Sequence, residues 1–332
     1  MRAYSMQAIA RGADGVMFFQ WRQSVAGAER FHSGMLPHFG AESRVFKSIA
    51  ALGAELPGLD SVVGEKNAAS VAIVFEWDSW WSLEQPAVPA AISYVDEVFA
   101  WYRRFWARNL VVDFVRADDD LTAYPLVIVP SLFSATPSSL QNLGSVAVAG
   151  AQLVVTFQTG VVDANSRISE GGYLGPLADV LGIRVEEFAP FAAPGLRGPS
   201  SVDSPLGSIR GDVTGVDHVR TWAEFLHVID ADIMATFVGD SLDNWPAVTR
   251  RASQAGFGAA WYVATVLGDN SLDRLIQRLI DDAKIADKAI AAPEGVEVVL
   301  RGSSRFSINH TDQPVVQFDE TIPARGVLVE KR

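Results

Sequence analysis

The sequence contains no cysteine. Without thiols, the chain can form neither a structural disulfide nor a zinc site built on thiolate ligands. The same absence excludes every mechanism that uses a cysteine nucleophile. A chain without cysteine fits the reducing cytoplasm, and we therefore expect a cytoplasmic protein.

Positive charge is also scarce, and long apolar runs are missing. Lys and Arg number 27 against 39 Asp and Glu, so the net charge is −12. A nucleic-acid partner is not expected, because binding to phosphates requires a basic surface. No apolar run approaches the roughly 20 residues that span a bilayer, and the N-terminus lacks the residue order of a signal peptide. We expect a soluble protein without a membrane partner.

The composition nevertheless supplies ample material for packed cores. Of the 332 residues, 49% are hydrophobic and 20% are charged. Because a single core seldom grows beyond roughly 250–300 residues, two or more domains are expected. Breaks at Pro57-Gly58 and near Pro293 predict a division into residues 1–58, 59–288 and 289–332.

Residues 12–32 are the most informative stretch. After turn residues, Val16 to Phe19 form a short apolar run, which is typical of a buried parallel strand. Helices are expected before it at residues 3–11 and after it at residues 42–56. In an α/β barrel, functional side chains follow the carboxyl ends of the strands. Four candidate side chains occupy that zone: Trp21, Arg22, Glu29 and His32.

The order of residue types here resembles the end of the catalytic barrel in the β-galactosidases of glycoside hydrolase family 42. Residues 12–15 read Gly-Ala-Asp-Gly, residues 20–24 read Gln-Trp-Arg-Gln-Ser, and residues 27–32 read Gly-Ala-Glu-Arg-Phe-His. The later chain is similar to this family in the order of its elements. The resemblance covers about the C-terminal half of a full family member. It implies that residues 1–58 are the last segment of a (β/α)8 barrel.

The resemblance also implies roles for the candidate residues. Glycosidases of this kind use two carboxyl groups roughly 5–5.5 Å apart. The family's two catalytic glutamates precede the matched stretch, so we expect both before Met1. Glu29 and His32 match residues that hydrogen-bond hydroxyls of the galactosyl ring, which suits a carboxylate and an imidazole. By their own chemistry, and not through the resemblance, Trp21 is a candidate for stacking on the sugar and Arg22 for orienting a carboxylate.

Spacing alone supports a plainer interpretation of the same residues. Glu29 and Arg30 could be charges that face solvent, and His32 could be a structural histidine. Trp21 and Arg22 are equally consistent with packing. No cofactor is implied, and the histidines show no metal-ligand spacing.

Between residues 59 and 288, strand-like apolar runs alternate with helical patterns. Strands are expected at 70–75, 110–115, 126–129 and 153–157, and helices at 89–109 and 138–149. This alternation predicts βαβ units and a mostly parallel sheet with helices on both faces. The first of these helices has one apolar stripe, made of Ile92, Val95, Phe99, Tyr102 and Trp106.

This order of elements resembles the flavodoxin-like fold of class I glutamine amidotransferases. Their hydrolysis requires a cysteine at a strand-to-helix turn, whereas the turn here reads Gln158-Thr159-Gly160. The equivalent domain of family 42 enzymes mediates trimerisation. We therefore expect residues 59–288 to assemble a homotrimer and not to catalyse a reaction.

The remaining chain is expected to be rich in strands. Residues 160–220 show no clear pattern beyond a short helix at 174–181 that Gly182 ends. Strands are expected at 225–229, 235–238, 247–250 and 259–266. Ser271 is a candidate N-cap for a helix that ends near residue 283. Short runs at 296–301, 305–310, 315–318 and 327–329 predict a small antiparallel β domain.

Three tryptophans, Trp77, Trp80 and Trp81, follow the strand at 70–75 and stand among acidic residues. Aromatic rings beside carboxylates suit a carbohydrate, through stacking and hydroxyl contacts. The alternative is a loop that buries aromatic side chains against a neighbouring domain or subunit. A combined role is a third interpretation, in which the tryptophans line an active-site rim across an interface.

Together with the resemblance, these patterns predict the C-terminal part of a retaining β-galactosidase. The complete enzyme would hydrolyse terminal β-D-galactosyl residues, while this part lacks both catalytic glutamates. Two alternatives remain: a non-catalytic oligomerisation module and an independent sugar-binding protein.

Overall fold

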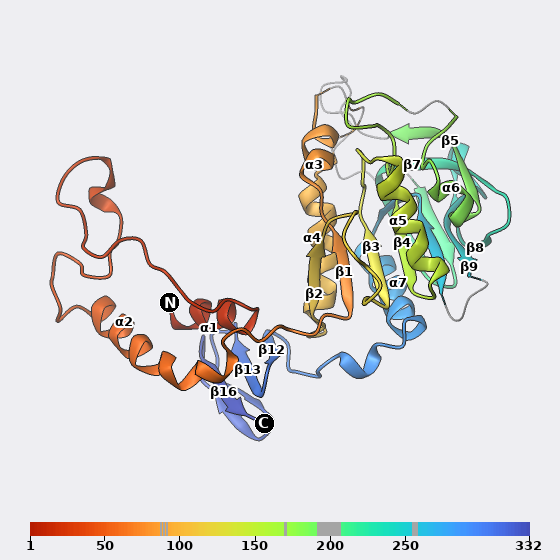
Figure 1. Cartoon of the computed structure of the whole chain (residues 1–332). Coiled ribbons are helices and arrows are strands. Elements are labelled where there is room, and N and C mark those ends of the chain that lie inside the picture. Colours follow the sequence, from red (N-terminus) through yellow and green to blue (C-terminus); the bar gives the residue numbers. More distant parts are fainter. Residues whose placement is uncertain (87, 89, 91, 169–170, 191–206, 254–257) are drawn as a thin grey trace. The chain divides into compact units, whose positions relative to one another are not determined.

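The computed structural model describes residues 1–86, 88, 90, 92–168, 171–190, 207–253 and 258–332. These residues form two compact units. The first unit combines residues 1–68, 107–111 and 290–332, and the second combines residues 69–106 and 112–289 (Figure 1). The chain therefore leaves the first unit and returns to it twice.

Five parallel strands organise the second unit. They are β1 (Val71–Val74), β2 (Val112–Val115), β3 (Leu126–Val129), β4 (Gln152–Thr156) and β10 (Ala259–Val263), in the order β2-β1-β3-β4-β10. Every residue of β1, β3, β4 and β10 is buried, as expected of parallel strands with both faces covered. The strands predicted at 70–75, 110–115, 126–129 and 153–157 are confirmed.

Helices pack on this sheet. α5 (Pro137–Val148) and α6 (Leu177–Leu181) share a core with alternate residues of β1 and β3, including Val74 and Val129. α4 (Tyr94–Trp106) contacts α7 (Asp269–Asp282). α6 ends at Gly182, whose φ of 67° is the left-handed conformation that glycine adopts without strain. The predicted helix at 138–149 and the helix end at Gly182 are confirmed.

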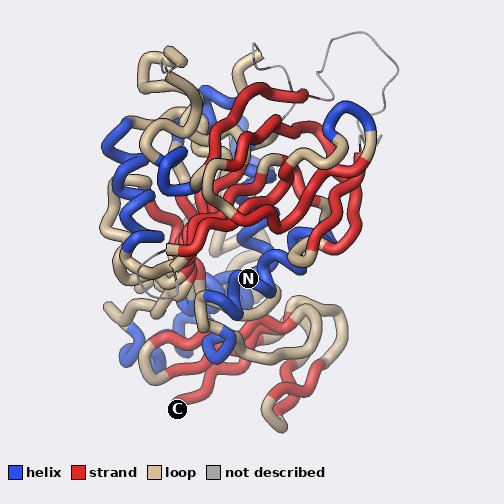
Figure 2. The backbone as a smooth tube through the Cα atoms, turned by 90° about the vertical axis from the view of Figure 1, so that its right-hand side faces the viewer, coloured by secondary structure: helices blue, strands red, loops and turns tan. Residues whose placement is uncertain are grey.

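The prediction of a mostly parallel sheet was incomplete, because the sheet continues in antiparallel fashion beyond β10. The added strands are β5 (Ile183–Pro190), β6 (Gly207–Gly211), β7 (Gly215–Val228), β8 (Asp232–Val238), β9 (Pro246–Ala252) and β11 (Thr265–Leu267). They make an 11-stranded mixed sheet of the described residues. Figure 2 shows these strands as twisted red tubes beside blue helices. β5 and β6 were missed because their pairing with β7 is set by distant residues and not by a local apolar pattern.

Helix boundaries and caps differ from the predictions in four places. The tryptophan segment is a short helix, α3 (Trp77–Leu83), and not a loop. The helix predicted at 89–109 is the shorter α4, and residues 89 and 91 lie outside the described residues. Ser271 lies inside α7 instead of capping it, where its backbone nitrogen donates to the carboxylate of Asp217 at 3.0 Å. The Pro57-Gly58 break is part of a 3₁₀ helix, η2 (Leu56–Val62).

The apolar stripe predicted on α4 is not the stripe that packs on the sheet. The buried side chains of α4 include Tyr94, Val98, Trp101 and Phe105. Val95 and Phe99 of the predicted stripe are 37% and 54% exposed. The helix is apolar on two sides, so periodicity alone could not tell which side faces the core.

The first unit joins both ends of the chain in one core. α1 (Arg2–Ala10) and α2 (Arg44–Glu55) pack with a sheet of β12 (Val296–Arg301), β13 (Ser304–Asn309) and β16 (Val327–Lys331). β14 (Val315–Gln317) and β15 (Glu320–Ile322) form a separate hairpin. The predicted helices at 3–11 and 42–56 and the antiparallel C-terminal strands are confirmed. The three-part division at 58 and 288 stays a prediction, and Met6, Leu52 and Phe306 share one core across it.

The strand predicted at Val16 to Phe19 is not formed. Val16 and Phe18 pack on the core of the first unit, while Met17 and Phe19 are 98% and 68% exposed. This alternation is that of an extended chain. A parallel strand also needs a neighbour, and among the described strands none pairs with these residues.

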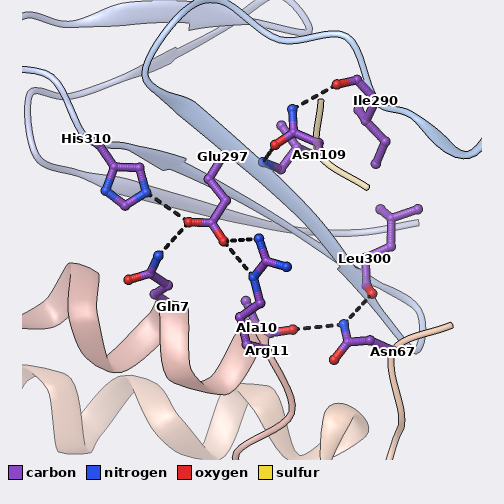
Figure 3. Close-up of polar contacts among 10 residues, drawn as sticks. Gln7, Ala10, Arg11, Asn67, Asn109, Ile290, Glu297, Leu300 and His310 are labelled. Carbon is purple, nitrogen blue, oxygen red and sulfur yellow. Dashed lines mark hydrogen bonds and ion pairs between the residues drawn. The ribbon is translucent and has the colours of Figure 1, made fainter. Parts of the chain in front are cut away.

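Polar side chains bind α1 to the C-terminal sheet (Figure 3). The fully buried carboxylate of Glu297 accepts hydrogen bonds from Gln7 at 2.6 Å and Arg11 at 2.7 Å, and it lies 2.9 Å from the ring Nε2 of His310. Asn67 donates to the backbone oxygens of Ala10 and Leu300, both at 2.9 Å. Buried polar groups of this sheet are therefore satisfied by residues from distant parts of the chain.

Glu224 of β7 is a fully buried acid in the large sheet. Its carboxyl group accepts hydrogen bonds from the backbone nitrogen of Gln158 (2.9 Å), the indole of Trp222 (3.2 Å) and the hydroxyl of Tyr262 (2.5 Å). Burial raises the pKa of Glu224 to about 7, although the three donors act in the opposite direction.

Glu224→Gln should remove one pH-dependent loss of stability. A carboxyl group with an ordinary pKa of 4.5 in the unfolded chain and about 7 in the fold destabilises the folded state as pH rises through that window. The wild type should therefore lose roughly 3 kcal/mol relative to the variant between pH 4.5 and pH 7. Urea unfolding at several pH values measures this difference. The exposed Glu187→Gln is the matched control, and a difference that does not change with pH would contradict the assignment.

Candidate functional site

The four residues predicted to contact a sugar lie on the loop between α1 and α2. At the start of this loop, Asp14 accepts hydrogen bonds from the backbone nitrogen of Gly64 at 3.0 Å and from Arg301. These two donors hold the pKa of Asp14 below its ordinary value. Arg301 is buried and also donates to the backbone oxygens of Ile9 and Ala13, both at 2.7 Å. The base of the loop is thereby fixed to β12.

Trp21 and Arg22 lie on an extended segment that pairs with residues 35–36. The backbone nitrogen of Leu36 donates to the oxygen of Trp21 at 2.8 Å. Trp21 is 61% exposed and meets Phe46 of α2 edge to face, with ring centroids 6.3 Å apart. Arg22 is exposed. Trp21 is therefore compatible with both packing and stacking on a sugar, because its ring contacts Phe46 while most of its surface is exposed.

Glu29 and His32 lie at one tight turn. Glu29 belongs to the 3₁₀ helix η1 (Ala28–Phe31), and the backbone nitrogen of His32 donates to the oxygen of Glu29 at 2.9 Å. Both side chains are exposed, and within the described part of the chain neither makes a side-chain hydrogen bond. The rings of His32 and Phe19 meet edge to face, at 6.1 Å between centroids. The turn thus presents a carboxylate and an imidazole to solvent.

Several apolar side chains of the same loop are exposed, and the sequence patterns did not indicate them. Val25, Phe31 and Phe39 are 81%, 83% and 80% exposed, in addition to Met17. Exposed large apolar side chains mark contact sites where they gather into one patch. Local spacing carried no signal for them, because whether a loop residue is covered depends on what packs against the loop.

The tryptophans of α3 form a stacked group. The rings of Trp77 and Trp80 are stacked at 5.3 Å, and Trp77 and Trp81 are 56% and 60% exposed. The carboxylate of the neighbouring Glu76 already accepts a hydrogen bond within the chain, from the backbone nitrogen of Ala117 at 2.8 Å. Exposed rings remain free for a sugar or for another protein surface.

At the turn after β4, Gln158-Thr159-Gly160 takes the place of the cysteine that amidotransferase hydrolysis requires. Gln158, with a φ of 57°, occupies the strand-to-helix turn after β4 and is 2% exposed. A cavity of about 140 Å³ lies at the carboxyl ends of β1 and β3, lined by Glu76, Asp78 and Arg116, among others. No nucleophile paired with a base lines this cavity in the described residues.

Neither a cluster of metal ligands nor a membrane-spanning helix is found in the described ranges. No group of three or more His, Asp or Glu side chains there is placed to hold a metal ion. No described helix combines the length and the apolar composition that crossing a membrane requires.

Comparisons with known proteins agree with this arrangement. A family model described as "Beta-galactosidase" matches residues 1–59, and one described as "Beta-galactosidase trimerisation domain" matches residues 69–286. The β-galactosidase BgaB of a Geobacillus species is 41% identical over 95% of this chain, and LacZ of Heyndrickxia coagulans is 38% identical over 96%. The chain spans 46% of the length of each of these relatives.

Solved structures give the same result. The β-galactosidase of Bacillus circulans sp. alkalophilus matches 99% of this chain with a TM-score of 0.88 and 29% identity, over 51% of its own length. The cold-adapted β-galactosidase of Rahnella sp. R3 matches all of this chain with a TM-score of 0.86. The chain belongs to the β-galactosidases of glycoside hydrolase family 42.

Proposed function

We propose that this chain acts as the C-terminal half of a retaining β-galactosidase. One observation carries the proposal: the β-galactosidase match at residues 1–59 is followed by the trimerisation-domain match at residues 69–286, in relatives about twice as long. Residues 1–58 then complete a (β/α)8 barrel, and residues 59–288 assemble a homotrimer. We also propose a cytoplasmic location.

The exposed loop supports the role as the end of a barrel. Val16 to Phe19 is extended and has no strand partner among the described residues. A barrel would supply strand neighbours for it and would cover Met17 and Phe19. The order β2-β1-β3-β4-β10 supports a flavodoxin-like assembly domain, since it corresponds to the strand order 2-1-3-4-5.

Glu29 and His32 would bind the galactosyl ring in the complete enzyme. A carboxylate can accept two hydroxyl hydrogen bonds, and an imidazole can give or accept one in a fixed direction. Two groups on one turn can therefore distinguish an axial hydroxyl from an equatorial one. Trp21 would stack on the sugar and Arg22 would orient a carboxylate. Both catalytic glutamates would come from the part of the enzyme that this chain does not span.

The purified chain should not hydrolyse a chromogenic β-galactoside by itself. A hybrid that joins the preceding part of BgaB to Met1 should do so, because it brings the two carboxyl groups to the loop. Release of nitrophenol from both proteins at equal concentration measures the difference. Activity of the chain alone would contradict the proposal.

In the active hybrid, Glu29→Gln and His32→Ala should each lower kcat/KM for a β-galactoside. The expected loss is roughly 10- to 150-fold, because each variant removes a hydrogen bond to a substrate hydroxyl. The preference for galactoside over glucoside should fall as well. Arg30→Ala is the matched control, since its guanidinium caps the backbone oxygen of Gly27 at 2.7 Å and has no proposed contact with the sugar. Unchanged kinetics in both site variants would remove these residues from the site.

A further inference from the structure

α4 is apolar on two sides, and on the second side Val95 and Phe99 are 37% and 54% exposed. Tyr94, Val98, Trp101 and Phe105 are at most 5% exposed and face the core of the second unit. The other side carries Val95, Phe99 and Tyr102 at helical spacing. Exposed apolar side chains that gather on one side of a helix often mark a contact with another surface. The outer side of α4 therefore needs an explanation.

An exposed aromatic residue of the neighbouring strand extends this outer side. Phe114 of β2 is 53% exposed. Its ring lies 5.4 Å from the ring of Tyr102, which lies 6.4 Å from the ring of Phe99. The three rings form one continuous row on two elements, here called the aromatic row.

The aromatic row lies beside an open sheet edge. β2 ends the large sheet and pairs only with β1 among the described strands. Open edges are usually protected by charges or prolines, because their unpaired backbone groups invite association. The one charged residue of β2, Asp113, instead accepts a hydrogen bond from Tyr124 at 2.8 Å. Hydrophobic surface and an unprotected edge thus coincide.

We propose that the aromatic row, together with Val95, contacts a second copy of this chain. The inference rests on the proposed homotrimer and names its surface. The trimerisation-domain match at residues 69–286 includes the whole row, which makes another copy the expected occupant. In a closed three-fold ring every chain has two neighbours, so a single exposed row is covered in all three copies. Aromatic residues at the centre of such contacts carry much of the binding energy.

The first test compares the mass in solution of three proteins. The wild type should have three times the mass of the 35.8 kDa chain by sedimentation equilibrium. Phe99→Lys combined with Phe114→Lys should raise the concentration at which half the trimer dissociates by about 30-fold or more. Val216→Lys combined with Ile233→Lys is the control, because these residues are also exposed and apolar, at 72% and 51%, but lie on β7 and β8. The control should stay trimeric.

The outcomes separate the two proposals. A wild type that is monomeric at every concentration would overturn both the homotrimer and the aromatic row. A trimeric wild type whose double variant dissociates no more readily than the control would overturn the row alone. Thermal unfolding of each variant shows whether the fold is kept.

A second test does not disturb the row. Because the chain contains no cysteine, Val95→Cys introduces a single thiol. At concentrations that favour the trimer, this thiol should react with a maleimide about tenfold or more slowly than after dilution. Val216→Cys should react at the same rate in both conditions. Equal rates for Val95→Cys in both conditions would contradict the proposed contact even if the double-lysine variant fails to fold.

Discussion

The requirement that a strand have neighbours is the constraint on which the rest of this structure depends. β1, β3, β4 and β10 meet it on both sides and are fully buried. Val16 to Phe19 has the apolar composition of such a strand but no neighbour among the described residues, and it remains extended with Met17 exposed. The same composition thus gives two outcomes, because parallel pairing comes from segments distant in sequence. The loop that carries the proposed sugar-binding residues Glu29 and His32 follows this unpaired segment.

Buried polar groups fix the part of the first unit that is complete. The Glu297 carboxylate is hydrogen-bonded to Gln7, Arg11 and His310. Arg301 donates hydrogen bonds to Asp14 and to the backbone oxygen of Ile9 near the end of α1. A buried charge without its partners would be costly, so these contacts select one arrangement of the two chain ends. The loop that carries Glu29 and His32 therefore begins from a rigid base.

Much of the fold could be predicted from the sequence, since continuous apolar runs rich in β-branched residues, such as Val71–Val74, specify buried strands locally. The failures share one cause. β5 and β6 form through pairing with distant β7, and the outward side of α4 also carries apolar residues, Val95 and Phe99. In each case a partner that is not local decides the outcome. The raised pKa of Glu224, which the E224Q experiment tests, is another effect of this kind, because the residues that bury Glu224 are also distant in sequence.

In the candidate site, too, the sequence predicted some features, and contacts between residues that are not neighbours in the sequence determine the others. Glu29 and His32 were indicated by resemblance to a family, while spacing alone favoured surface charges. The structure adds that the rings of His32 and Phe19 meet edge to face and that Val25, Phe31 and Phe39 of the same loop are exposed. Neither feature has a local signature, because both depend on how an irregular loop folds back on itself.

Hydrogen–deuterium exchange at the backbone amides of residues 16–19 tests the central claim most directly. In this chain alone these amides should exchange within seconds, because they have no strand partner among the described residues. When the preceding part of BgaB is joined to Met1, the same amides should become strongly protected, as expected of a barrel strand paired on both sides. Equally fast exchange in both proteins would contradict the account that residues 1–58 complete a β-galactosidase barrel.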